Sequence, residues 1–244
     1  MKKSSFFVLL LMLVAQFSMA QKKKVAVVTF YANKVVGFSD LGIGSEQLIK
    51  EIFNLRDNPN FNLTPILNQY HDKFFNEYAK ELPFELLSEN EVCESEGYIQ
   101  FQPKFDLNKY EARDYLLFEK YKYIYEGLMG QANEVAMAKL FADKADGVMF
   151  VSINFELIKG FGVGGTATVK VRATTRLALY DKQGNKVFAF SEGENSKKTG
   201  VMVKGIPVLS PEKILPMCES ALTELMGDLS KRLEKIVKKT AIKL

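Results

Sequence analysis

The sequence has few of the residues on which acid–base and metal chemistry depends. It contains one histidine, His71, and two cysteines, Cys93 and Cys218. A single histidine leaves little room for a Ser–His pair or for a histidine metal site. The many carboxylates form no recognisable catalytic pair. We therefore predict a protein that is not an enzyme and that uses neither a cofactor nor a metal ion.

The chain also has only a small excess of positive over negative charge. The formal net charge of +4 includes Lys2 and Lys3, and without this N-terminal pair it is 4 − 2 = +2. A balance this close to zero does not support nucleic-acid binding, which needs a strongly basic surface. Beyond the first residues, no run is long enough for a membrane-spanning helix, which needs roughly 20 apolar residues. We expect neither nucleic acid as a partner nor a transmembrane segment in the mature chain.

The N-terminal residues have the three parts of a secretory signal peptide. Lys2 and Lys3 precede the apolar run 6–14, and small residues at positions 18 and 20 precede Gln21. We predict a cleavable signal peptide over residues 1–20, cleavage after Ala20, and a periplasmic or secreted mature chain. The alternative is a membrane anchor, which requires a longer apolar run. No cysteine stands at the cleavage site, so no lipid attachment is expected.

The two cysteines leave two interpretations open. Cys93 and Cys218 could form a disulfide in an oxidising compartment. Alternatively they remain buried free thiols, which pack like small hydrophobic side chains. A catalytic cysteine is disfavoured, because the only histidine, His71, lies in a separate polar stretch of the sequence.

Five segments have the patterns of β-strands, namely residues 25–30, 84–87, 148–158, 166–180 and 186–191. The first is continuously apolar, as in a strand buried on both faces. In residues 148–158 and 166–180 apolar and polar side chains alternate, and residues 186–191 follow a turn at Gly184. Together these three segments predict a long β-hairpin over residues 148–191. Residues 192–205 are expected to form a loop.

The strand over residues 166–180 separates its side chains cleanly. Small and apolar residues face one way, and Lys170, Arg172 and Arg176 face the other. At ~3.3 Å per residue this strand would span roughly 50 Å. Because that exceeds the usual strand length, we expect it to bend or to project beyond the sheet.

A glycine-rich segment, residues 160–165 (GFGVGG), joins the two long strands. Its spacing invites comparison with a dinucleotide-binding loop, but such a loop leads into a helix whose N-terminal amides hold phosphate. This segment leads into another strand, so we predict a hairpin connection. Phe161 and Val163 then stand at its tip, unless Phe161 folds back onto the core.

Helical periodicity predicts helices near residues 45–53, 65–80 and 130–144 and from Ser210 to the C-terminal region. For the last helix we expect Ser210 as N-cap and a kink or restart at Pro216. Its lysine-covered face is consistent with a core-packed terminal helix or, alternatively, with a membrane-surface or partner helix. The opposite apolar stripe comprises Cys218, Leu222, Leu225, Leu229, Leu233 and Ile236.

Two other segments have a structural and a functional interpretation. Glutamates at positions 89, 91, 94 and 96 predict a solvated acidic loop rather than a metal site, because no oxygen-ligand spacing with a fixed glycine is present. A tyrosine-rich segment over residues 97–126 fits amphipathic packing or, alternatively, a face that binds sugars or peptidoglycan. Its tyrosines are Tyr98, Tyr110, Tyr115, Tyr121, Tyr123 and Tyr125.

Together these patterns predict an α/β (α+β) fold. We expect a mixed sheet of about four or five strands with helices packed mainly on one face and a C-terminal amphipathic helix. The length of the mature chain suits a single domain over residues 21–244.

Three short motifs resemble those of an exported α/β family. Residues 25–30 (VAVVTF) resemble its "VAVLPF"-like first strand, residues 142–149 (ADKADGVM) its "GADYVL"-like entry to the third strand, and residues 177–184 (LALYDKQG) its "LVDxxTG"-like strand and turn. The curli secretion channel subunit (CsgG-like), the lipoprotein activators of penicillin-binding proteins and the N-terminal domain of TolB share this fold. The resemblance covers about half of the mature chain.

The chain also departs from that family. It lacks the lipidated cysteine of the channel subunits and activators, and residues 31–82 and 97–126 are insertions relative to the compact form of the family. The charged face of the long strand suits water better than lipid. The resemblance therefore implies a binding or assembly module rather than a pore.

Three functions are weighed from the sequence. The leading hypothesis is a non-enzymatic envelope protein that binds another protein, with Phe161, Val163, Lys170, Arg172 and Arg176 as contact residues. The second is a subunit that binds a glycan or another ligand, or one that forms a homo-oligomeric ring. The third, a cell-wall hydrolase, would need a catalytic pair that the sequence does not show.

Overall fold

The computed structural model describes residues 22–38, 41, 55–104, 112–204, 206–208 and 210–240. The predicted signal peptide, the predicted helix over residues 45–53 and Tyr110 lie outside these residues. Cleavage after Ala20 therefore stays a prediction.

The described residues form a mixed sheet of eight strands in the order β2-β1-β4-β5-β7-β8, with β3 beside β1 and β6 beside β5. β1 runs parallel to β2 and β4, whereas β4, β5 and β6 are antiparallel. The strands are β1 Lys24–Asn33, β2 Glu85–Leu86, β3 Tyr115–Leu117, β4 Gly147–Val163, β5 Thr166–Asp181, β6 Lys186–Asn195, β7 Gly200–Val203 and β8 Ile206–Val208.

The predicted fold class is confirmed, and all five predicted strands are present. The sheet is larger than expected because three short strands, β3, β7 and β8, pair with the edges of longer ones. The predicted loop over residues 192–205 was wrong, since β6 continues to Asn195 and β7 lies within it. Pairing satisfies backbone groups that the edges of β1 and β5 would otherwise leave to solvent.

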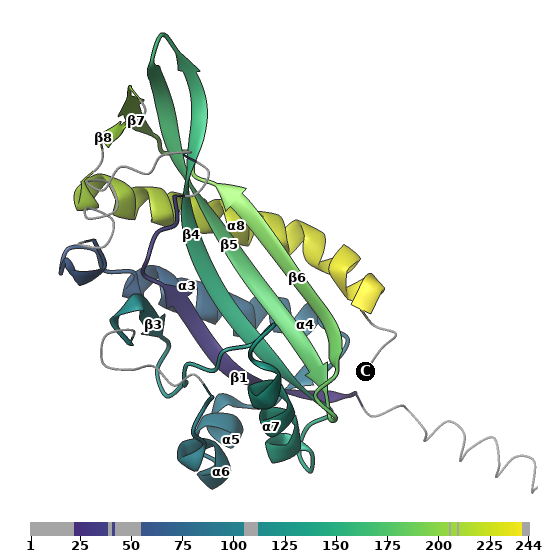
Figure 1. Ribbon diagram of the computed structural model, residues 1–244. Helices are drawn as coiled ribbons and strands as arrows, with labels where there is room; N and C mark the ends of the chain where they lie inside the picture. The colour runs from purple at the N-terminus through teal and green to yellow at the C-terminus, as the bar shows by residue number, and fades with distance from the viewer. Residues whose placement is uncertain are drawn as a thin grey trace, which may run out of the picture.

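Helices cover the two faces of the sheet unequally (Figure 1). On the covered face, Leu177 of β5 packs among Phe74, Tyr78 and Leu229. On the second face, α7 covers only the end near the turn at Gly184. The helices are α3 Thr64–Lys73, the π-helical turn η2 Phe74–Tyr78, α4 Ala79–Glu81, α5 Glu89–Cys93, α6 Glu96–Gln100, the 3-10 turn η3 Ala112–Asp114, α7 Gln131–Phe141 and α8 Pro211–Thr240.

The helix predicted over residues 65–80 is present as α3, η2 and α4 in succession. Its predicted stripe is buried throughout, at Ile66, Tyr70, Phe74 and Tyr78. The chain widens to a π-helical turn over Phe74–Tyr78. The interior of this layer is aromatic, because Phe30 of β1 contacts the rings of Tyr70 and Phe74.

α8 begins directly after Ser210, as expected, and runs to Thr240. The predicted restart at Pro216 was wrong, because the helix continues through this residue. Pro216 is the sixth residue of α8 and has no amide hydrogen, so the helix lacks the one bond that this position would donate to the Glu212 carbonyl. The predicted stripe is confirmed as buried at Cys218, Leu222, Leu225, Leu229 and Leu233.

The predicted acidic loop was wrong, because residues 89–100 form α5 and α6. Ser88 caps α5: its Oγ accepts a hydrogen bond from the Glu91 amide at 3.3 Å, and the Glu91 carboxylate accepts one from the Ser88 amide at 3.0 Å. This reciprocal arrangement is a capping box, in which the glutamate serves the helix start.

We expect Ser88→Ala to lower the free energy of unfolding by about 1 kcal/mol, because an N-cap serine satisfies an amide at the helix start. Urea denaturation of the mature chain measures the change. Ser191→Ala, at an exposed position of β6, is the control and should stay within about 0.5 kcal/mol of the wild type. Equal effects of the two substitutions would contradict a role for the cap.

Candidate functional site

The most exposed part of the sheet is the end of the β4–β5 hairpin, which projects beyond the helices (Figure 1). Gly164 and Gly165 alone separate the two strands, and both have positive φ values, +61° and +83°. Two consecutive residues with positive φ define a type I′ turn, which glycine adopts without strain. The prediction of a hairpin connection at residues 160–165 is confirmed.

The other glycines of this segment allow close contact between the strands. The register shifts between Lys159 and Gly162, so two residues of β4 oppose one residue of β5. A Cβ atom at Gly160 would stand 2.2 Å from Thr168 Oγ1. The bulge and the missing side chains, rather than phosphate binding, therefore account for the glycine-rich pattern.

Large apolar side chains are exposed at this end of the hairpin. Phe161 is 81% exposed and Val163 is 72% exposed, so Phe161 does not fold back onto the core. The register puts Val163, Thr166 and Val203 in one row across β4, β5 and β7. The exposed apolar side chains here are Phe161, Val163, Val201, Val203 and Val208. With Lys159, Lys170 and Lys204 they form what we call the tip surface, which covers both faces of the hairpin end, since Lys159 lies opposite Val169 and Lys170 points to the other face.

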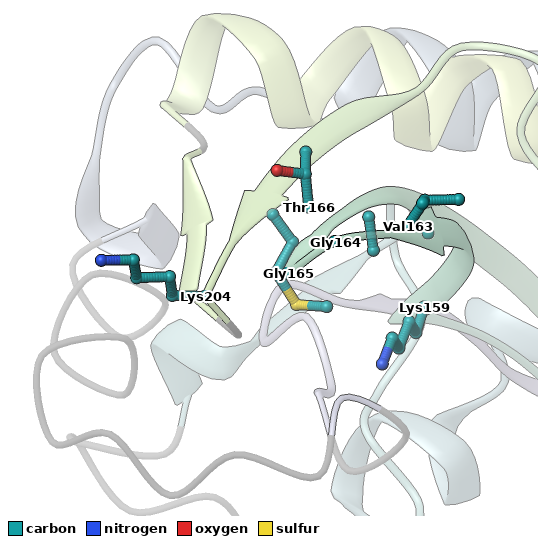
Figure 2. Close-up of a pocket in the computed structure, with 9 residues that line it drawn as sticks. Lys159, Val163, Gly164, Gly165, Thr166 and Lys204 are labelled. Atoms are coloured by element: carbon teal, nitrogen blue, oxygen red, sulfur yellow. The ribbon is translucent and has the colours of Figure 1, made fainter.

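A hollow of about 260 Å³ lies beside these residues. Its lining includes Ala167, Met202 and Gly162, which contributes no side chain. Figure 2 shows Lys159 and Lys204 on opposite sides of this hollow. The Lys204 amide donates a hydrogen bond of 2.7 Å to the Gly165 carbonyl, which holds β7 against the turn. The hollow therefore lies between two cationic side chains and has a lining of mixed polarity.

All charges in the two segments that build the tip surface are positive. Residues 157–171 and 196–209 contain Lys159, Lys170, Lys197, Lys198 and Lys204, and neither segment contains an aspartate or glutamate. Lys197 is paired with Glu224 at 2.7 Å. The tip surface therefore combines exposed apolar side chains with charge of a single sign, and it would repel another basic surface.

The five residues predicted as contact residues do not form one surface. Phe161, Val163 and Lys170 belong to the tip surface. Arg172 donates a hydrogen bond to Asn195 Oδ1 at 3.1 Å. Arg176 lies ten residues from the start of β5, roughly 33 Å away. Its guanidinium forms an ion pair with Glu126, so it holds the segment before α7 against the second face.

Glu126 is held by two partners. Burial raises the pKa of its carboxyl, but hydrogen bonds from Arg176 and Tyr180 outweigh burial and leave this pKa below its usual value. The Tyr180 hydroxyl donates to Glu126 Oε2 at 2.7 Å. Because the Glu126 side chain is only 11% exposed, this ion pair gives Arg176 a structural role, and its assignment as a contact residue stays a prediction.

The tyrosine-rich segment is mostly part of the core. Tyr98, Tyr121 and Tyr123 are buried, and Tyr115 contacts the Tyr123 ring with centroids 4.2 Å apart. The Tyr98 hydroxyl donates to the Val28 carbonyl at 2.9 Å. These contacts favour the packing interpretation over a ligand face, because buried rings are not available to a sugar.

The two cysteines and the only histidine lie in the interior. Cys93 and Cys218 are buried free thiols, which decides between the two interpretations, and burial raises the pKa of Cys93 to about 12. His71 is also buried, contrary to its polar sequence surroundings. Its Nε2 lies 2.7 Å from Glu89 Oε1, and its ring stacks on Phe118 with centroids 3.5 Å apart.

Two further observations concern metal-binding clusters and membrane-spanning helices. Within the described part of the chain, no group of three or more histidine, cysteine, aspartate or glutamate side chains could hold a metal ion. None of the described helices is both apolar enough and long enough to cross a bilayer.

Sequence reasoning missed Val201, Met202, Val203, Lys204 and Val208 as parts of the tip surface. The run of three apolar residues, Val201, Met202 and Val203, was the available signal for β7. β7 has only four residues, and the part of β5 with which it pairs lies more than thirty residues earlier in the chain.

Comparisons with known proteins do not assign this chain to a family. No protein-family model and no curated protein matches the sequence. A solved structure of a neuraminyllactose-binding hemagglutinin homolog from Helicobacter pylori is similar with a TM-score of 0.39 and 9% sequence identity, over 90% of each chain. Similarity at this level supports no inference about function, so the assignment must come from the chain itself.

Proposed function

We propose that the mature chain is an exported, non-enzymatic module of the cell envelope that binds a protein partner through the tip surface. The observation that carries this proposal is the exposure of Phe161 and Val163 at the end of a long hairpin. Large apolar side chains gathered at an exposed position are typical of interaction sites. Export and the periplasmic or secreted location follow from the predicted signal peptide.

The shape of the hairpin supports a contact role. A two-residue turn and the pairing of β4 with β5 order the backbone around Phe161, so little conformational entropy is lost on binding. Aromatic anchors at the centre of an interface commonly carry much of its binding energy. The adjacent hollow, with Met202 in its lining, offers a recess for an apolar side chain of the partner.

The alternatives have less support. A glycan-binding face would need exposed aromatic rings, whereas most of the described tyrosines are buried. A hydrolase would need a positioned nucleophile or acid pair. A self-assembling subunit remains compatible with the same tip surface, because a second copy is also a protein partner.

The test is photo-crosslinking from position 161 in the native cells. A photoreactive phenylalanine analogue at Phe161 is expected to give one dominant product of discrete mass, whereas the same analogue at Lys80, exposed on α4, should give none. Val163→Ser should reduce the yield at position 161 by removing neighbouring apolar contact. A reactive residue at position 161 that traps no protein would sink the proposal.

A further inference from the structure

We infer that the partner of the tip surface is a second copy of this chain, which presents its acidic helices α5 and α6 to the tip. This inference rests on the proposed function, because it assigns the partner of the same surface. It is carried by two surfaces of opposite charge at opposite ends of one molecule.

The second surface is built by α5 and α6. Residues 85–100 contain five glutamates and no lysine or arginine. Glu91, Glu94 and Glu96 are exposed, and Ile99 is 56% exposed beside them. Together these four side chains form what we call the acidic surface, which is the counterpart of the tip surface in both charge and apolar content.

Two basic side chains, Lys120 and Lys122, lie near the acidic surface and balance it only in part. The Lys122 ammonium donates to the carbonyls of Ile99 and Phe101 and to no carboxylate that the structure describes. Lys120 pairs with Glu94 at 2.6 Å, and both side chains are more than half exposed. An ion pair this exposed contributes little and can open to admit another cation. Glu96 has Gln100 as its hydrogen-bond partner, at 3.0 Å, and no described lysine or arginine lies within ion-pair distance of it.

The two surfaces cannot meet within one molecule. The hairpin tip and the helices α5 and α6 lie at opposite ends of the sheet, as Figure 1 shows. Contact between them therefore requires two molecules in a head-to-tail arrangement. Such an interface is heterologous, so repetition gives a ring if the rotation closes and a filament if it does not.

Chemistry favours this arrangement over other self-contacts. Tip-to-tip pairing would bring Lys159 and Lys204 of two molecules together, and like charges placed across an interface disfavour association. Strand addition at β8 is hindered by Pro207, which has no amide hydrogen to donate. In the head-to-tail arrangement, Ile99 can enter the hollow lined by Met202, while glutamates approach the two lysines at its rims.

The first experiment maps the contact in the purified mature chain. A photoreactive analogue at Phe161 is expected to give a dimer of this chain, with the adduct on a peptide from residues 85–100. A dimer whose adduct lies elsewhere, such as at the tip of the second copy, overturns the inference. A product with a different envelope protein in cells, and no self-product, also overturns it but leaves the proposed function intact.

The second experiment reverses charge at each surface and measures association by sedimentation velocity. The tip variant carries Lys159→Glu and Lys204→Glu, and the acidic variant carries Glu94→Lys and Glu96→Lys. Each is expected to weaken self-association by about tenfold or more, since every 1.4 kcal/mol corresponds to a factor of ten. Raising the salt concentration should weaken the wild type as well.

Rescue makes this test specific. The chain that carries all four reversals should associate again, because its surfaces are complementary with the signs exchanged. Lys80→Glu with Lys231→Glu, at exposed positions of α4 and α8, is the matched control and should leave association unchanged. Circular dichroism confirms that each variant is folded. Unchanged association of the tip and acidic variants, or no rescue in the fourfold variant, would overturn the inference.

Discussion

Tyr98→Phe is expected to lower the free energy of unfolding by about 2–4 kcal/mol. Tyr98 is fully buried, and its hydroxyl donates to the Val28 carbonyl and accepts a hydrogen bond from the Lys122 amide at 2.8 Å. The substitution leaves both backbone groups without this partner in the interior, and each unsatisfied group costs about 1–3 kcal/mol. Val28 lies where the register between β1 and β4 shifts, so Tyr98 compensates for an irregular strand.

Urea denaturation at neutral pH measures this change. The control is Tyr115→Phe, because Tyr115 is only half-buried, and its substitution should cost less than about 1 kcal/mol. The result also bears on function. A Tyr98→Phe protein that is as stable as the wild type would reopen the possibility that this tyrosine serves a ligand rather than the core.

Glu126→Gln is expected to lower the free energy of unfolding by about 2–4 kcal/mol at pH 7. The substitution keeps the shape of the side chain but removes the charge that faces Arg176. Removal of one partner from a buried pair costs about 3–5 kcal/mol, and the lower value here reflects the 34% exposure of Arg176. Glu96→Gln, at an exposed position, is the control and should have a small effect.

The effect of Glu126→Gln should depend on pH. The pKa of Glu126 is lowered in the folded protein, so its stabilising contribution is fully present above the unfolded value of about 4.3. The contribution is lost as the pH falls through the lower, folded pKa. The gap in stability between wild type and variant should therefore be widest near pH 7 and should narrow below pH ~4. A gap that widens towards acid pH would contradict this role for Glu126.

Much of the fold follows from local patterns. The alternation in residues 166–180 predicts which side chains of β5 are buried, and the structure confirms it from Ala167 to Leu177, beyond which Ala178 and Tyr180 are buried as well. The stripe on α8 is predicted in the same way. These predictions succeed because side-chain direction follows from backbone geometry within each element, with a period of two in a strand and 3.6 in a helix.

Local patterns fail where a second segment decides the outcome. The glutamates of residues 89–96 suggested a loop because acidic side chains are solvated, yet Ser88 and Glu91 cap a helix there. The charge on Arg176 suggested a contact residue, yet Glu126, fifty residues away, is its partner. The residue type indicates what a side chain can bind, but it does not indicate which group of another segment lies beside that side chain in the fold.

The same distinction between local patterns and contacts of distant segments applies to the candidate site. The hairpin and its glycine turn are predictable from the sequence, because they depend on neighbouring residues, whereas the exposure of Phe161 is known from the structure. Only the tertiary structure added β7 and β8 beside the tip, buried the tyrosines and separated the basic tip surface from the acidic surface. The physical reason is that strand pairing and charge segregation arise between segments distant in the chain, whose encounter no local periodicity records.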